Sequence, residues 1–289
     1  MRSYEITYPS VNTESHIKNI TAFVIEPDRL NAHTGAMLIT HGWGGNRLDY
    51  RETMAYACEE FNLICLSVEF RQSGFDFDPV KGLGAYVPYD ASFYQVFDVL
   101  NGLRTILDLR PGVNRRRLFL YGGSQGGHIT LLSTIYAPQT FAFAYATSPV
   151  TYIESHIQKW AGREFAAYEF SIRNVMDHAE FIDCPLRLEH GTIDDIVPDH
   201  HTRLLAAKLE SLKKSFTVEY IEGGGHSLAP VTSRLETFKR IAPEPLKTLT
   251  REGDDDFLRG SIVEIPCQDR VLRIDWSKPT DSIELFCWK

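Results

Sequence analysis

At positions 118–127 the chain reads Leu118-Phe119-Leu120-Tyr121-Gly122-Gly123-Ser124-Gln125-Gly126-Gly127, an apolar run followed at once by a Gly-x-Ser-x-Gly pattern. The apolar run has the length and composition of a buried strand, and a helical pattern begins near Gln125. A sharp turn from strand to helix strains the backbone at Ser124, and Gly122 and Gly126 leave room for neighbouring backbone. The stretch is typical of a reactive serine at a strand end, with an ordinary turn serine as the simpler alternative.

Short apolar runs alternate with stretches of helical length on both sides of this turn. The strand-like runs cover residues 36–40, 63–68, 118–121, 143–147, 186–189 and 218–221, and two more, 4–8 and 20–25, precede them. Apolar residues recur at helical spacing over residues 49–61, 92–109, 125–136, 199–212 and 231–241. This alternation predicts an α/β fold, with a mostly parallel central sheet and helices on both faces.

The chain, at 289 residues, exceeds the usual size of one domain. We expect a catalytic domain over residues 1–250, interrupted by insertions near 73–94 and 149–184, and a small C-terminal β appendage over residues 251–289. Three strand-like runs in the appendage, 261–267, 271–276 and 283–288, should bury one side each. The apolar positions on that side are Val263, Ile265, Leu272, Ile274, Trp276, Leu285 and Cys287. The amino-terminal strands or a second subunit would cover them, so a homo-oligomer is one expectation.

Two further strands end in residues that could serve the serine. A serine hydroxyl needs a general base and a group that orients that base, in the chain order Ser, acid, His. Asp194, followed by Asp195, comes just after the run 186–189, and His226 lies in a glycine-rich loop after the run 218–221. We expect Ser124, Asp194 and His226 to form a catalytic triad, although a helix N-cap and a loop histidine are ordinary alternatives. Asp195 would then cap the following helix.

The early strand 36–40 ends in His41-Gly42-Trp43-Gly44-Gly45. A tetrahedral intermediate carries a negative oxygen that requires preorganised N–H donors. The backbone amides of Gln125 and Trp43 are the expected donors, with Gly42 as the alternative if the loop is shifted by one residue. Trp160 and Tyr168, aromatics of the second insertion, are candidate substrate contacts, and packing against the body is the alternative for them.

The composition excludes several other functions. A formal charge of −8 disfavours nucleic acid and anionic membranes as partners. We expect solvated surface for the basic triplet 115–117 and a solvated linker for the acidic run 254–256. No secretory segment or membrane-spanning run is visible, and five scattered cysteines indicate a reducing, cytoplasmic location. No metal-binding spacing occurs, so we expect no metal and no cofactor. No basic motif flanks the triad candidates, which predicts a neutral small-molecule substrate.

These motifs make the chain resemble the α/β-hydrolase superfamily over roughly residues 20–241. The His-Gly-aromatic loop, the Gly-Gly-Ser-Gln-Gly-Gly turn and His190-Gly191-x-x-Asp194-x-x-Val197-Pro198 are similar to three groups. These are acetyl xylan esterases with cephalosporin C deacetylases, dienelactone hydrolases, and the catalytic domains of prolyl oligopeptidases. The esterase group usually shows Arg-Gly-Gln where this chain has Arg71-Gln72-Ser73, and oligopeptidases usually carry Arg at the position of Ile196. The resemblance favours Asp194 over Asp195 as the triad acid.

The residues and the resemblance together predict a serine hydrolase that cleaves carboxylic esters of small substrates through an acyl-enzyme. A prolyl-oligopeptidase-like peptidase is the first alternative. Oligopeptidases of this type generally use a large extra domain to admit peptides, and too few residues precede the first core strands here to form one. A non-catalytic binding protein with a hydrolase fold is the second alternative, and a complete triad argues against it.

Overall fold

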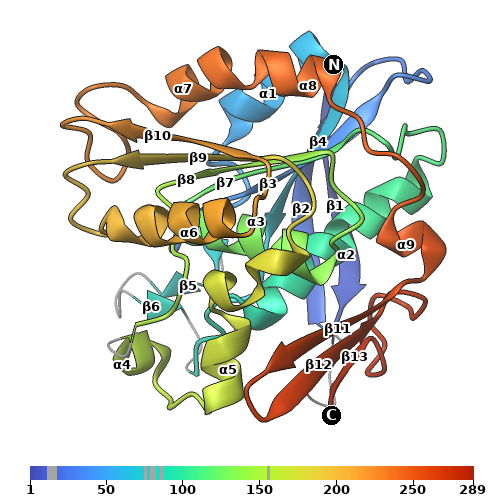
Figure 1. Cartoon of the computed structure of the whole chain (residues 1–289). Helices are drawn as coiled ribbons and strands as arrows, with labels where there is room; N and C mark the ends of the chain where they lie inside the picture. The colour runs from blue at the N-terminus through green and yellow to red at the C-terminus, as the bar shows by residue number, and fades with distance from the viewer. Residues whose placement is uncertain (12–17, 75–76, 79–82, 85–87, 155–156) are drawn as a thin grey trace.

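Eight strands form the central sheet, in the order β1-β2-β4-β3-β7-β8-β9-β10 (Figure 1). The two antiparallel pairings are β1 with β2 and β2 with β4, and every other pairing is parallel. The predicted mostly parallel sheet is therefore confirmed. The strands are β1 (Arg2–Ser10), β2 (Lys18–Glu26), β3 (Gly35–Thr40), β4 (Leu63–Glu69), β7 (Leu118–Gly123), β8 (Phe143–Thr147), β9 (Leu186–Gly191) and β10 (Phe216–Ile221).

This computed structural model describes residues 1–11, 18–74, 77–78, 83–84, 88–154 and 157–289, with the backbone alone at 77–78, 83–84, 157 and 160. Most of the predicted insertion 73–94 thus lies outside the described side chains. The described short elements of the two insertions are β5 (Phe77–Asp78), β6 (Leu83–Gly84), α4 (Ile157–Ala161), α5 (Ala167–Ile172) and a 3-10 helix (Val175–Phe181). No helix among the described residues is both long and apolar enough to span a membrane.

Helices cover both faces of the sheet, as predicted. On one face lie α1 (Arg51–Phe61), α7 (Arg234–Ile241) and α8 (Pro243–Thr248), and on the other lie α2 (Phe93–Leu109), α3 (Gln125–Tyr136) and α6 (His200–Ser211) (Figure 1). Because the strands are buried on both faces, they read as continuous apolar runs. The proline at the start of α8 suits a first helical position, and the apolar pattern alone did not predict this helix.

The acidic run is not a solvated linker. Asp255 is buried, accepts two hydrogen bonds from the Arg115 guanidinium and caps α9 (Asp256–Arg259). Asp256 is also buried and accepts from the backbone amide of Gln139. The basic triplet is likewise engaged, since the Arg117 guanidinium donates to backbone carbonyls. These charged and polar contacts hold the start of the appendage against the body of the sheet domain.

The appendage is a three-stranded antiparallel sheet of β11 (Ile262–Cys267), β12 (Arg270–Asp275) and β13 (Phe286–Trp288). Its buried side belongs to the same hydrophobic core as α2 and α3. The cover therefore comes from helices of the body: Phe97 of α2 stacks on Phe286, with ring centroids 4.8 Å apart. Cys287 is exposed, contrary to the prediction, because Phe286 and Trp288 pack against the body instead.

Candidate active site

Ser124 sits at the turn between β7 and α3, with φ 59° and ψ −126°. A Cβ atom on Gly126 would lie 2.1 Å from the Thr40 carbonyl oxygen, and one on Gly122 would lie 2.2 Å from Thr40 Oγ1. No larger residue fits either position, because β3 passes directly beside the turn. The strain at Ser124 is thus held in place by the close packing of β3, β7 and α3, and it lifts the side chain out of the sheet.

His226 and Asp194 meet beyond the ends of β9 and β10. The Nδ1 atom of His226 lies 2.8 Å from Asp194 Oδ2, while Asp194 Oδ1 accepts hydrogen bonds from the backbone amides of Ile196 and Val197. Ser124 and His226 line one cavity together. The three residues expected to form a triad are therefore brought to one place, with the carboxylate in position to fix the tautomer and orientation of the imidazole.

The Asp194 carboxylate is fully buried. Burial by itself would raise the pKa of Asp194, but hydrogen bonds from His190 and His226 and from the Val197 amide outweigh it and hold that pKa well below its usual range. Asp194 is consequently ionised at neutral pH and can stabilise a protonated His226.

His190, the first residue of the motif that contains Asp194, also lies at this site. Its Nε2 atom lies 2.8 Å from the Val197 carbonyl oxygen and 3.2 Å from Asp194 Oδ2, and its Nδ1 lies 2.7 Å from the Thr202 hydroxyl. The carbonyl contact requires a proton on Nε2, so that proton also faces the Asp194 carboxylate. A second histidine therefore braces the carboxylate that holds His226.

Asp195 points away from this arrangement. Its side chain is exposed and lines a different cavity, on the other side of Ser124. It does not cap the following helix as predicted, because α6 starts at His200 with Asp199 at the N-cap. The choice of Asp194 as the acid that contacts His226 agrees with the geometry.

The loop after β3 reaches the nucleophile. A Cβ atom on Gly42 would lie only 3.4 Å from the Ser124 Cβ, and Trp43 lines the cavities on both sides of the serine. Gln125 is the first residue of α3, where the geometry of a helix leaves the backbone N–H without an intrahelical acceptor. The two expected oxyanion donors, Gln125 and Trp43, thus flank Ser124 on separate segments.

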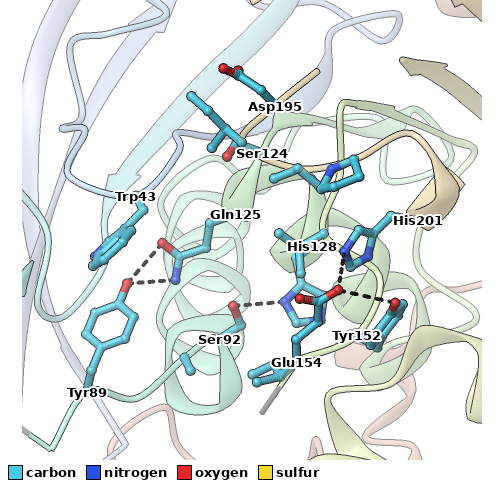
Figure 2. A pocket seen from close by; sticks show the side chains of 16 residues that line it. Trp43, Tyr89, Ser92, Ser124, Gln125, His128, Tyr152, Glu154, Asp195 and His201 are labelled. Atoms are coloured by element: carbon cyan, nitrogen blue, oxygen red, sulfur yellow. Dashed lines mark hydrogen bonds and ion pairs between the residues drawn. The ribbon is translucent and has the colours of Figure 1, made fainter. Parts of the chain in front are cut away.

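A largely apolar pocket of about 510 Å³ opens on one side of Ser124 (Figure 2). Its floor is a network in which Gln125 Nε2 donates to the Tyr89 hydroxyl oxygen (2.7 Å) and to Gln95 Oε1 (2.9 Å). The lining residues are Trp43, Tyr89, Ala91, Ser92, Ser124, Gln125, His128, Val150, Tyr152, Ile153, Glu154, Asp195, Ile196, Val197, Pro198 and His201. An apolar group bound here would lie beside the serine.

The predicted substrate contacts of the second insertion do not line this pocket. Tyr168 instead packs on Trp288 of the appendage, with ring centroids 4.7 Å apart, and under the Arg270 guanidinium. The packing alternative is the correct one for Tyr168. The side chain of Trp160 lies outside the described residues. The insertion contributes other residues to the wall, among them Ile153 and Glu154.

Polar groups gather at the far end of this pocket. Ligand atoms of Glu154, His200 and His201 lie within 4.8 Å of one another, so this cluster is where a metal ion could bind. However, the backbone amide of Thr151 donates to His201 Nδ1, which leaves the proton of the neutral imidazole on Nε2, facing Glu154. Glu154 contacts the His200 and His201 imidazoles only beyond hydrogen-bond distance, at 3.7 Å and 3.9 Å. His201 is buried.

A smaller, polar cavity of about 370 Å³ opens on the other side of Ser124. Its lining includes His226, the carboxylate-bearing Asp49, and Arg234, the first residue of α7. The Arg234 guanidinium donates to the His226 carbonyl oxygen (2.8 Å). The prediction, made from the lack of a basic motif beside the triad candidates, did not anticipate Arg234, which lies eight residues after His226 and is carried to the cavity by the helix that follows the His226 loop.

Comparisons with known proteins agree with this arrangement. The sequence model of the prolyl oligopeptidase family matches residues 90–242, just over half of the chain. Dipeptidyl peptidase family member 1 of Caenorhabditis elegans is 26% identical over 221 residues, which cover 70% of this chain and 26% of that protein.

Solved structures show the same α/β-hydrolase fold at low sequence identity. Pyrococcus horikoshii acylaminoacyl peptidase superposes with a TM-score of 0.69 at 17% identity, over 87% of this chain and 42% of that chain. A putative dipeptidyl aminopeptidase IV from Bacteroides ovatus gives a TM-score of 0.67 at 16% identity, over 84% and 35%. The chain thus spans about a quarter of the curated relative and less than half of these solved chains.

Proposed function

The chain belongs to the prolyl oligopeptidase family and is a serine hydrolase, and from this premise we propose that it is a peptidase acting on short peptides. The observation that carries the proposal is the meeting of Ser124 and the His226–Asp194 pair between two cavities, one apolar and one polar. A peptide bond at Ser124 would place one part of the substrate in each cavity. This reverses the order of the two readings that the sequence alone favoured.

In the proposed reaction Ser124 Oγ attacks the carbonyl carbon of the scissile bond while His226 Nε2 accepts the hydroxyl proton. Asp194 holds the Nδ1–H of His226 and stabilises the imidazolium that forms. The backbone amides of Gln125 and Trp43 donate to the oxyanion. His226 then protonates the leaving nitrogen, which departs as an amine, and a water molecule hydrolyses the acyl-enzyme by the same route.

Two features support an amide as the substrate. An amine leaves only when its nitrogen is protonated, and an ionised Asp194 beside His226 supports that proton transfer. The second cavity, which Ser124 and His226 line together, gives the leaving part of a peptide a place to bind. Hydrolysis of small esters is the second candidate function, favoured by the apolar lining beside Ser124, which suits a short acyl group.

The test compares esters and amides that share one acyl group. Aryl esters and anilides of a short series of N-blocked and free amino acids and dipeptides are assayed on protein whose active sites have been titrated with a fluorophosphonate, with Ser124→Ala as the blank. Because esters are intrinsically more reactive, a faster ester reaction decides nothing. We expect Ser124-dependent cleavage of anilides in at least one acyl series. Turnover of esters without turnover of any anilide would reject the peptidase and favour the esterase.

A further inference from the structure

We propose that Arg234 forms an anion-binding subsite beside Ser124, which binds the carboxylate at the end of a short leaving group. The inference deepens the proposed function, because for a peptidase such a group is a free C-terminal carboxylate close to the scissile bond. The preferred substrates would then be short peptides cleaved near their C-terminal end.

The Arg234 side chain lies beside the turn that carries Ser124. A Cβ atom on Gly123, the residue before the nucleophile, would lie 2.9 Å from both Cζ and Nε of Arg234. The guanidinium therefore packs directly on the backbone of the nucleophile turn. Arg234, Ser124 and His226 all line the polar cavity, so a ligand in that cavity meets the guanidinium and the reacting groups together.

Among the residues that the structure describes, the positive charge of Arg234 has no carboxylate partner nearby. Within the described residues, no carboxylate lies within ion-pair distance of Arg234, and its buried Nε–H has no hydrogen-bond partner. Arg240 on the same helix, by contrast, pairs with Glu219 at 3.0 Å. Asp49 lines the same cavity, but its carboxylate accepts hydrogen bonds from the backbone and side chain of Asn46.

No carboxylate of the described residues neutralises the Arg234 guanidinium, which lies at the wall of the polar cavity. Arginine binds carboxylates well because its planar fork matches their two oxygens. The unneutralised charge thus indicates an anionic, carboxylate-bearing ligand.

The position of His226 determines the side of Ser124 on which the leaving group departs. His226 delivers a proton to the leaving group, and it lines the polar cavity but not the apolar one. The leaving group therefore departs on the side of Arg234, and the acyl group occupies the apolar pocket. A carboxylate carried by the leaving group is consequently the anion that Arg234 can reach.

The experiment uses two matched pairs of substrates. One pair is a peptide with a free C-terminal carboxylate and the same peptide as its C-terminal amide. The other pair is an aryl ester with 3-hydroxybenzoate as leaving group and the same ester with 3-hydroxybenzamide. The readout is the ratio of kcat/KM, acid over amide, in each pair. It is measured for the wild type, Arg234→Gln, Arg234→Lys, and Arg240→Gln as an arginine control on the same helix.

We expect the wild type to prefer the anionic member about tenfold, in keeping with a charge-assisted hydrogen bond. Arg234→Gln should bring the ratio close to one, Arg234→Lys should retain part of it, and Arg240→Gln should leave it unchanged. Because Arg234 also holds the His226 carbonyl, Arg234→Gln should slow both members of a pair. A purely structural role would slow them equally and leave the ratio intact, and this result would overturn the proposal.

Different results would reject the peptidase activity and the Arg234 subsite. If neither peptide is cleaved but the ester pair shows an Arg234-dependent preference, the peptidase is rejected and the subsite stands. If the peptides are cleaved without preference for the acid, the subsite is rejected and the peptidase stands. Protection from fluorophosphonate labelling gives the same comparison without turnover: 3-hydroxybenzoate should protect the wild type better than 3-hydroxybenzamide does, and Arg234→Gln should abolish the difference.

Discussion

The two cavities that meet at Ser124 differ in size, lining and origin. The larger one is largely apolar and is built from the loop after β3, the end of the first insertion, the turn at Ser124, the second insertion and the loop before α6. The smaller one is polar and is built from the loop after β3, the His226 loop and the start of α7. Ser124 and Trp43 are the residues that line both.

This difference shows how one serine can treat the two halves of a substrate differently. The apolar pocket selects by shape and by apolar area, which discriminates weakly between similar groups. The polar cavity is lined by His226 and Arg234, so under the two proposals it would select by charge and take part in proton transfer. Substitutions of Ser124, His226 or the proposed oxyanion donors should therefore affect every substrate, whereas those at the other positions of one cavity should mainly affect the half of the substrate that binds there.

The largest effect is expected at Ser124. Ser124→Ala should reduce turnover at least a thousandfold for every ester and amide tested, because it removes the attacking atom. The same change should abolish labelling by a fluorophosphonate and leave the fold intact by circular dichroism. Persistent labelling of the variant would show that another residue is the nucleophile.

The neighbouring acids provide the next comparison, because Asp194 contacts His226 and Asp195 lines the apolar pocket. Asp194→Asn should lower kcat by two to three orders of magnitude, since the amide favours the wrong tautomer of His226. Asp195→Asn is the matched control and should change kcat less than about threefold. Steady-state kinetics of both variants on one substrate check this, and the reverse ranking would assign the triad role to Asp195.

A smaller effect is expected at the floor of the apolar pocket. Tyr89→Phe removes the hydroxyl that bonds the Gln125 and Gln95 side chains. We expect kcat to fall about tenfold with little change in KM, because the amide of Gln125 is less firmly placed in the oxyanion site. The buried polar groups left behind should lower the free energy of unfolding by about 1–2 kcal/mol in urea titrations. Unchanged kcat with lowered stability would reduce Tyr89 to a structural role.

The last comparison concerns acid stability, to which two histidines of the apolar pocket should contribute. Burial lowers the pKa of His128 to about 4 and that of His201 to about 3, and both side chains line this pocket. In the unfolded chain both titrate near 6.5. Between pH 6.5 and those lowered values the unfolded state binds protons that the folded state does not, so stability falls as the pH falls.

The expected loss is on the order of 3 kcal/mol between pH 6.5 and 4.5. His201→Asn should remove about half of this slope in urea titrations at a series of pH values, while His33→Asn, at an exposed position, should leave it unchanged. Equal slopes in the wild type and His201→Asn would contradict the assignment.

Much of the sheet and the triad candidates could be predicted from the sequence because the relevant signals are local. A buried parallel strand is an uninterrupted apolar run, and functional residues commonly follow its carboxyl end, where the candidates Ser124, Asp194 and His226 lie. The strained turn can also be recognised in the sequence, because β3 lies too close for any residue but glycine at positions 122 and 126.

The pocket walls could not be predicted in this way, because they depend on contacts between distant segments. Tyr168 was predicted to contact the substrate because it lies in an insertion rich in aromatic residues. Its ring packs instead on Trp288 of the appendage. Arg234 carries no motif, and it enters the site only because α7 turns back along the sheet. His190 begins the motif that contains Asp194, but its contact with the Asp194 carboxylate depends on how the intervening loop folds back.

The contacts between the appendage and the body join segments that are synthesised at different times. The Trp276 indole donates to the Tyr136 carbonyl oxygen, 140 residues earlier, and Asn101 donates to the Thr280 carbonyl oxygen, 179 residues later. At common rates of translation, α2 leaves the ribosome roughly ten to thirty seconds before the strands that cover it. For that interval the ring of Phe97 lacks its stacking partner Phe286, so an aromatic surface of the nascent chain stays uncovered until the last strand has been synthesised.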